Sequence, residues 1–310
     1  MKCSYCNMQA IAWEPAVRRQ YCNNHYAWFI ERKVEKTIEK YKLLQGVRKL
    51  VIAVSGGKDS VALLRILHKL YDGKIKLLGV TIDLGIDQYS REASMIALKH
   101  YKELSIDYIC VDLKEEYGFT ISYIKMNKRV LRLHRSICSL CGTVKRYVLN
   151  KIASEENADA IATGHNMNDL LYQIIASMIS GSREDLGKAL LKTPSRNGLV
   201  SRIKPLAFLS DKQTLLYNMA INSAFFWKSC PYAEQGTLKR DVLDALDSIE
   251  HKHPGFKESL LVNFLKLVES TKQATTGIVY KCKRCGMPTN KPDICAFCKL
   301  RETLLERIKT

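Results

Sequence analysis

Blocks of apolar residues alternate along the chain in a pattern that predicts an α/β fold. Short apolar runs rich in β-branched residues predict buried parallel strands at residues 50–54, 74–83 and 107–113. A helical spacing of apolar residues follows the first run, from residue 61 to 70, and residues 158–169 read as a further strand and a turn into a helix. Strands and helices that alternate in this order build a doubly wound parallel sheet.

Residues 27–44 precede the first strand and predict an amphipathic helix. Charged residues alternate there with apolar ones at helical spacing, namely Trp28, Ile30, Val34, Ile38 and Tyr41. The predicted helix links the N-terminal segment to the main domain. Cys110 lies inside the apolar run "IDYICVDL" and is interpreted as a core residue.

Composition narrows the class of protein. A chain of 310 residues can form one large α/β domain with small appendages or two domains. Its net charge of +18 favours a polyanionic partner, most simply nucleic acid, over the alternative of a merely solvated basic surface. No run approaches the roughly 18 apolar residues of a membrane span, and "MKCSYCNM" lacks the apolar stretch of a signal peptide. The expectation is a cytoplasmic protein with no membrane partner.

Eleven cysteines without a secretion signal favour metal binding or redox chemistry over disulfides. Two groups have the spacing of closed tetrahedral zinc sites, C-x2-C-x15-C-x2-H near the N-terminus and C-x2-C-x9-C-x2-C near the C-terminus. A short segment of this kind buries too little surface to fold without its metal. The predicted ligands of the two Zn²⁺ ions are Cys3, Cys6, Cys22 and His25, and Cys282, Cys285, Cys295 and Cys298.

The stretch "SGGKDS" lies directly after the first predicted strand and opens a helix. This geometry aims backbone N–H groups at an anion, the two glycines permit close approach, and Lys58 adds a positive charge. The pattern differs from the Walker A loop. Ligands of such sheets bind at the carboxyl ends of strands, which places the backbones of Ala53, Ile82 and Gly164 near a nucleotide. The predicted phosphate-binding residues are Ser55, Gly56, Gly57, Lys58, Asp59 and Ser60.

A further CxxC pair, Cys138 and Cys141, stands in "CSLCGTVKR", and Cys230 stands in "SCPY". Iron–sulfur clusters favour thiolate ligands, and three protein thiolates on a four-iron cluster would leave one iron free to carry an exogenous sulfide. Two other interpretations stay open: a redox pair that carries a persulfide with Cys230 as the resolving thiol, and a structural zinc site.

The order of these motifs, together with "GHNMND", resembles the tRNA 2-thiouridine synthetase family of the PP-loop ATP-pyrophosphatase superfamily, which includes TtuA. The resemblance covers nearly the whole chain and implies the adenine nucleotide alpha hydrolase-like fold. It implies that ATP with Mg²⁺ adenylates the C2 oxygen of a tRNA uridine and that sulfur then displaces AMP. The catalytic residues it implies are Cys138, Cys141, Cys230, Lys145 and Asp169, and in members that resemble TtuA the three cysteines hold a [4Fe–4S] cluster.

The resemblance also implies partners and a domain division. A ubiquitin-like carrier would deliver sulfur to a homodimer, and position 54 of tRNA is slightly favoured over wobble position 34. The expected domains are an N-terminal zinc module (1–30), a catalytic domain (31–278) and a C-terminal zinc module (279–302). Asn168, Leu170 and Leu84 stand where the family commonly has acids, so fewer carboxylates are expected near the metal.

Two rival functions remain. One is a non-catalytic RNA-binding module with two zinc clips and a degenerate nucleotide fold, against which the intact "SGGKDS" argues. The other is a different ATP-dependent tRNA modifier, such as a cytidine-modifying PP-loop enzyme, against which the three extra cysteines argue.

Overall fold

The computed structural model describes residues 1–127, 130, 136–181, 187, 189–233, 237–271 and 279–305. Its centre is a six-stranded sheet with the order β5-β4-β3-β6-β8-β7. Neighbouring strands from β5 to β8 are parallel, and β7 is antiparallel at one edge. The chain starts in the middle of the sheet and builds outward on both sides, as the doubly wound prediction requires. The strands are β3 (Lys49–Ala53), β4 (Lys76–Asp83), β5 (Asp107–Asp112), β6 (Ala160–Ala162), β7 (Lys192–Thr193) and β8 (Ser201–Ile203).

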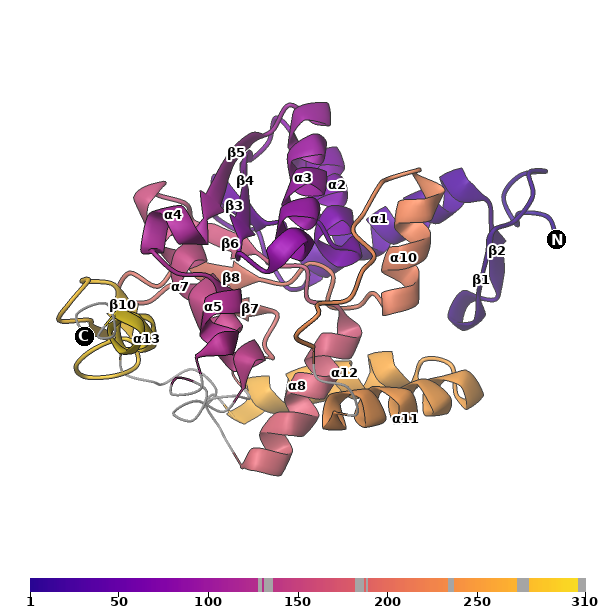
Figure 1. Ribbon diagram of the computed structural model, residues 1–310. Helices are drawn as coiled ribbons and strands as arrows, with labels where there is room; N and C mark the ends of the chain where they lie inside the picture. The colour runs from indigo at the N-terminus through magenta and orange to yellow at the C-terminus, as the bar shows by residue number, and fades with distance from the viewer. Residues whose placement is uncertain are drawn as a thin grey trace.

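Helices cover both faces of this sheet (Figure 1). β3 shows why: Leu50 and Ile52 enter one core, whereas Val51 enters the other. The first core is closed by α1 (Asn23–Lys40), α2 (Lys58–Tyr71), α3 (Asp87–Glu103), α8 (Met167–Ser180), α10 (Asp211–Ala220) and α12 (Phe256–Thr271), with α11 (Leu238–Lys252) packed on α8 and α12. The second is closed by α4 (Leu113–Tyr117), α5 (Ile121–Met126), α7 (Ile137–Glu155) and α13 (Ala296–Leu305).

The predicted helix at 27–44 forms four residues earlier, as α1. It begins after the N-cap Cys22, and a turn with Lys42 in the left-handed region (φ 50°) follows its end. Ile30, Val34 and Ile38 are buried as the pattern predicts, but Trp28 is 46% exposed.

The interpretation of Cys110 as a core residue is wrong, because its side chain is exposed. The run that contains it is β5, which is an edge strand and has one buried residue, Val111, among its six, instead of the predicted buried pattern. An apolar run looks the same in sequence whether its strand lies in the middle or at the edge of a sheet.

Small β-hairpins stand at the two ends of the chain and lie on opposite sides of the molecule (Figure 1). The N-terminal hairpin pairs β1 (Ala12–Glu14) with β2 (Arg19–Tyr21), joined by the 3-10 helix η1 (Pro15–Val17). The C-terminal hairpin pairs β9 (Tyr280–Lys281) with β10 (Pro288–Thr289). The division at 30/31 stays a prediction, and α1 runs unbroken across it. Within the described residues, no helix is long and apolar enough to cross a membrane.

Candidate active site

The "SGGKDS" stretch, residues 55–60 and named the phosphate turn after its predicted ligand, joins the carboxyl end of β3 to the start of α2. Gly56 adopts φ 82°, and a Cβ built there would lie 2.0 Å from the backbone oxygen of Ala93 in α3, so only glycine fits. The Ser60 hydroxyl accepts a hydrogen bond from the Ser55 N–H (3.1 Å) and donates to the Gly57 carbonyl (2.9 Å), which closes the turn. The first N–H groups of α2 lack intrahelical acceptors and face the turn, where they favour an anion.

Lys58 lies between two carboxylates. Its Nζ atom donates to both Asp59 oxygens (2.9 and 2.7 Å) and pairs with Asp211. Burial lowers the pKa of Lys58, but Asp59 and Asp211 raise it to a net increase, so the ammonium stays charged. Asp211 is the first side chain of α10, 153 residues away in sequence.

Buried amides hold these carboxylates in place. Asn166 donates to Asp59 Oδ1 (3.2 Å) and Asp211 Oδ1 (3.0 Å), and Asn168 donates to Asp211 Oδ2 (3.1 Å). Thr214 Oγ1 donates to Asp59 Oδ1 at 2.6 Å. Sequence reasoning missed Asn166, Asp211 and Thr214. The capping boxes that begin α8 and α10 fix Asn166 and Asp211 locally, but the capping pattern carries no sign of which site a helix start faces.

A buried lysine stabilises the hydrogen-bond network around Asp59 and Asp211 by contacting Asn168. Lys257 of α12 is 2% exposed, and its Nζ donates to Asn168 Oδ1 (3.2 Å) and pairs with Asp247 of α11. Asn168 therefore links a buried cation to the acidic side of the site. Leu170 and Leu84, the other two departures from the family pattern, are buried apolar side chains.

The remaining predicted nucleotide contacts lie at the same edge of the sheet. Ala53 ends β3 and Ile82 lies near the end of β4, and the two strands are paired. Gly164 follows β6, and a Cβ there would lie 3.1 Å from the Asp59 carbonyl carbon and from the Ser60 nitrogen. Gly164 therefore lies tightly against the turn, and its contact with a nucleotide stays a prediction.

Asp169 and Lys145 lie on different helices, α8 and α7. Asp169 closes the capping box of α8 and pairs with Lys239 of α11 at 3.0 Å. Lys145 is exposed on α7, one helical turn after Cys141. His165 bonds Thr163 through Nδ1 (2.8 Å), His68 pairs with Asp72 (3.7 Å), and His134 lies outside the described residues.

Cys138, Cys141 and Cys230 share one neighbourhood. Burial raises the pKa of the Cys141 thiol, the Lys145 ammonium lowers it, and the nearby Cys230 and Cys138 raise it further, so the net shift is upward. The pKa of Tyr89 in α3 is also raised, by burial first and then by Cys230 and Cys141. Cys138 is exposed and the other two thiols are partly buried.

An irregular segment, residues 223–230, joins these thiols to the phosphate turn. The Phe226 N–H donates to the Gly56 carbonyl (2.8 Å), and the Phe226 ring packs edge-on against Tyr89 at 5.0 Å. Tyr232 bonds Ser122 of α5 at 2.8 Å and anchors the chain after Cys230. Tyr89 thus lies between the cysteine group and Phe226, which contacts the phosphate turn.

The terminal clusters form as the spacing predicts. Among the described residues, these two groups each bring four ligand atoms within 4.8 Å of one another. In the N-terminal group, His25 Nδ1 lies 3.3–3.5 Å from the sulfurs of Cys22, Cys3 and Cys6. Closed sets of thiolates and imidazole at such separations fit one tetrahedral zinc ion each. The C-terminal group also packs on α7, where Phe297 stacks on Tyr147 at 3.8 Å.

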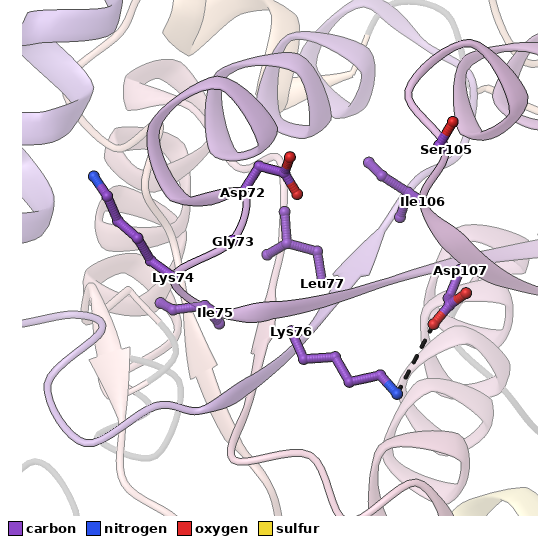
Figure 2. A pocket seen from close by; sticks show the side chains of 9 residues that line it. All are labelled: Asp72, Gly73, Lys74, Ile75, Lys76, Leu77, Ser105, Ile106 and Asp107. Atoms are coloured by element: carbon purple, nitrogen blue, oxygen red, sulfur yellow. Dashed lines mark ion pairs between the residues drawn. The ribbon is translucent and has the colours of Figure 1, made fainter.

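A separate hollow of about 380 Å³ lies at the opposite edge of the sheet, where β4 and β5 begin (Figure 2). Its lining mixes charges, and Lys76 pairs with Asp107 across it at 3.9 Å. Ligands of doubly wound sheets bind at the carboxyl ends of the strands, so this hollow is remote from the candidate site.

Comparison with known proteins agrees with this geometry. A family model described as a PP-loop domain matches residues 28–243. The tRNA-5-methyluridine(54) 2-sulfurtransferase of Pyrococcus horikoshii is 33% identical over 96% of this chain and 93% of its own length, and that of Thermus thermophilus is 30% identical over 100% and 94%. The solved structure of the U34-tRNA thiolase NcsA from Methanococcus maripaludis with its [4Fe–4S] cluster matches with a TM-score of 0.78 and 27% identity, over 99% of this chain and 96% of that one.

Proposed function

The chain belongs to the PP-loop domain family, together with tRNA 2-thiolation enzymes that match nearly all of it, and on this premise we propose that it is an ATP-dependent tRNA-uridine 2-sulfurtransferase. The observation that carries the proposal is a direct structural link between the predicted ATP-binding turn and the predicted sulfur-transfer cysteines. One short segment contacts the phosphate turn through Phe226 and supplies the Cys230 thiol four residues later.

In the first half-reaction the turn binds the ATP phosphates. The uridine C2 oxygen attacks the α-phosphorus, the bond from that phosphorus to the pyrophosphate oxygen breaks, and the base is left adenylated. Lys58 balances charge that develops on the phosphates, and the N–H groups at the start of α2 hold them in place. We assign to Asp59 and Asp211 the binding of Mg²⁺ that accompanies the ATP, since carboxylate oxygens are its preferred ligands.

In the second half-reaction a sulfur nucleophile at the sulfide oxidation level adds to C2, and the C–O bond to AMP breaks. Exchange of oxygen for sulfide leaves the oxidation state of the base unchanged, so this step needs no reductant. We assign Lys145 to stabilise the negative charge that develops on the phosphate and Asp169 to contact Mg²⁺ or the nucleotide, as the family resemblance implies.

We propose that Cys138, Cys141 and Cys230 hold a [4Fe–4S] cluster, because iron–sulfur centres prefer thiolate ligands and both other thiols are near enough to Cys141 to raise its pKa. Bound there, the cluster would supply an iron site without a protein ligand, able to bind sulfide. We assign Zn²⁺ to the two terminal clusters as a structural ion, because their ligand sets are complete.

We also propose the finer identity of the substrate and partners. Position 54 is favoured, because the sulfurtransferases with the higher identities are named for that position, whereas the thiolase matched in structure is named for position 34. A ubiquitin-like carrier that delivers a thiocarboxylate, a homodimer and a cytoplasmic location follow from the family resemblance.

The test is a reconstituted reaction under anaerobic conditions with tRNA, ATP, Mg²⁺ and sulfide. Equal amounts of AMP, pyrophosphate and 2-thiouridine are expected, and nucleoside mass spectrometry of tRNA fragments maps the position. Cys138→Ala, Cys141→Ala and Cys230→Ala should each abolish thiolation and lower the iron content. Cys110→Ala is the matched control, since Cys110 is an exposed cysteine outside every cluster. Absence of AMP release with every tRNA would contradict the proposed function.

A further inference from the structure

Residues 223–230 have no regular secondary structure but are held at successive points. Ser223 N–H donates to Asn218 O at 2.8 Å, and His100 Nε2 bonds Ala224 O at 2.6 Å. Phe226 forms a parallel bridge with Gly57, and Lys228 pairs with Glu92 of α3 at 2.7 Å. The segment is therefore a fixed strap that runs from the end of α10 along α3 and past the start of α2.

Trp227 is the large apolar residue that this strap exposes to solvent. Its side chain is 79% exposed, although Phe226 before it is 8% exposed. Successive side chains of an extended segment point to opposite sides, so the contact that buries Phe226 turns Trp227 outward. The other tryptophans, Trp13 and Trp28, are 47% and 46% exposed.

The position of Trp227 places it between both reaction centres. Its neighbour Phe226 touches the phosphate turn, and Cys230 follows three residues later, a span of at most about 10 Å. A large aromatic ring presented to solvent by a fixed backbone loses little entropy when a ligand covers it.

We propose that Trp227 is the platform on which an unpaired base of the tRNA stacks, at or beside the target uridine. This inference rests on the proposed function and deepens it. A C2 oxygen must leave its stacked surroundings to meet the α-phosphate of ATP, and an extruded base needs a new stacking partner. Aromatic side chains stack on single-stranded bases with little dependence on sequence, and the +18 chain holds the surrounding phosphates.

The experiment compares Trp227→Ala and Trp227→Phe with wild type, with Trp13→Ala as the matched control of another exposed tryptophan. Tryptophan-to-alanine exchange should weaken tRNA binding roughly 5- to 150-fold, the range found for loss of one stacked base. The Phe variant should retain most of the affinity, and ATP affinity should be unchanged in both. The slope of log affinity against log salt should stay at the wild-type value, because no phosphate contact is lost.

A fluorescence measurement checks contact directly. In a Trp13→Phe/Trp28→Phe background, Trp227 is the chain's one remaining tryptophan, and tRNA should quench its emission. Wild-type tRNA affinity of Trp227→Ala, or unchanged emission on saturation with tRNA, would overturn the proposal. The proposal would also be overturned if Trp227→Ala thiolates tRNA normally with inorganic sulfide but fails with a carrier-bound thiocarboxylate. That result would assign the Trp227 ring to the binding of a protein partner. Failure of the wild type to thiolate any tRNA would instead refute the proposed function.

Discussion

Substitution by alanine should lower the free energy of unfolding at Gly56 but leave it nearly unchanged at Gly57, although both glycines belong to the phosphate turn. Gly56→Ala places a residue with a Cβ at φ 82°, which costs about 1–2 kcal/mol. The new Cβ also lies 2.0 Å from a backbone oxygen of α3, and the forced shift adds about 1–3 kcal/mol. We therefore expect Gly56→Ala to lower the free energy of unfolding by roughly 2–5 kcal/mol.

Gly57→Ala is the matched control within the same turn. Gly57 has φ −74° and ψ 162°, and the nearest atom to a new Cβ is Ser55 Oγ at 3.7 Å. Alanine fits there, so the free energy of unfolding should change by less than about 1 kcal/mol. The methyl group nevertheless stands where phosphate oxygens approach the backbone, and loss of one charge-assisted hydrogen bond should weaken ATP binding roughly 10- to 150-fold.

Urea denaturation gives the stability of each variant, and calorimetric titration with Mg²⁺ and ATP gives the affinity. The reasoning is refuted if Gly56→Ala unfolds within about 1 kcal/mol of Gly57→Ala, because the difference rests on positive φ and on the contact with Ala93. Unchanged ATP affinity of Gly57→Ala would remove the turn as the phosphate site.

Three further predictions concern buried charge and metal. Lys257→Met should lower the free energy of unfolding by about 1–3 kcal/mol, because Asn168 Oδ1 loses its donor while Asp247, which is 57% exposed, regains water. Urea denaturation measures this change. An unchanged free energy of unfolding would show that Lys257 does not support the network. The pKa of Lys204 is lowered from 10.5 to about 7, by burial first and then by Arg202, whereas Asp169 raises it. Between these two pH values the unfolded chain therefore binds more protons than the folded one. The free energy of unfolding should rise with pH there by up to about 1.4 kcal/mol per pH unit. Lys204→Met should remove that rise, and equal slopes in the two proteins would contradict it. Elemental analysis should find about two zinc ions per chain, falling to about one in Cys22→Ser and in Cys298→Ser, and an unchanged content in either variant would exclude its cluster as a zinc site.

The parts predictable from sequence are those that local chemistry determines. "SGGKDS" forms the predicted turn because a strand, two glycines and a helix start are contiguous, and both terminal clusters form because two residues separate the ligands of each pair. Asp211 escaped prediction, because its role depends on how α10 packs against α2 and not on its neighbours. The prediction that Cys110 lies in the core is wrong because the apolar run around it does not reveal that β5 is an edge strand, which depends on the topology of the whole sheet.

The charge balance of the site explains why the two carboxylates and the lysine occur together. One ammonium, Lys58, faces two carboxylates, Asp59 and Asp211, so the centre holds one more negative charge than positive. Three uncharged donors, Asn166, Asn168 and Thr214, keep the carboxylate oxygens fixed without neutralising them. A bare triphosphate would be repelled by that excess, whereas a divalent cation held by the two carboxylates would offset it and leave Lys58 available to the phosphates. We therefore expect the centre to bind ATP only together with a divalent cation, as the proposed function requires.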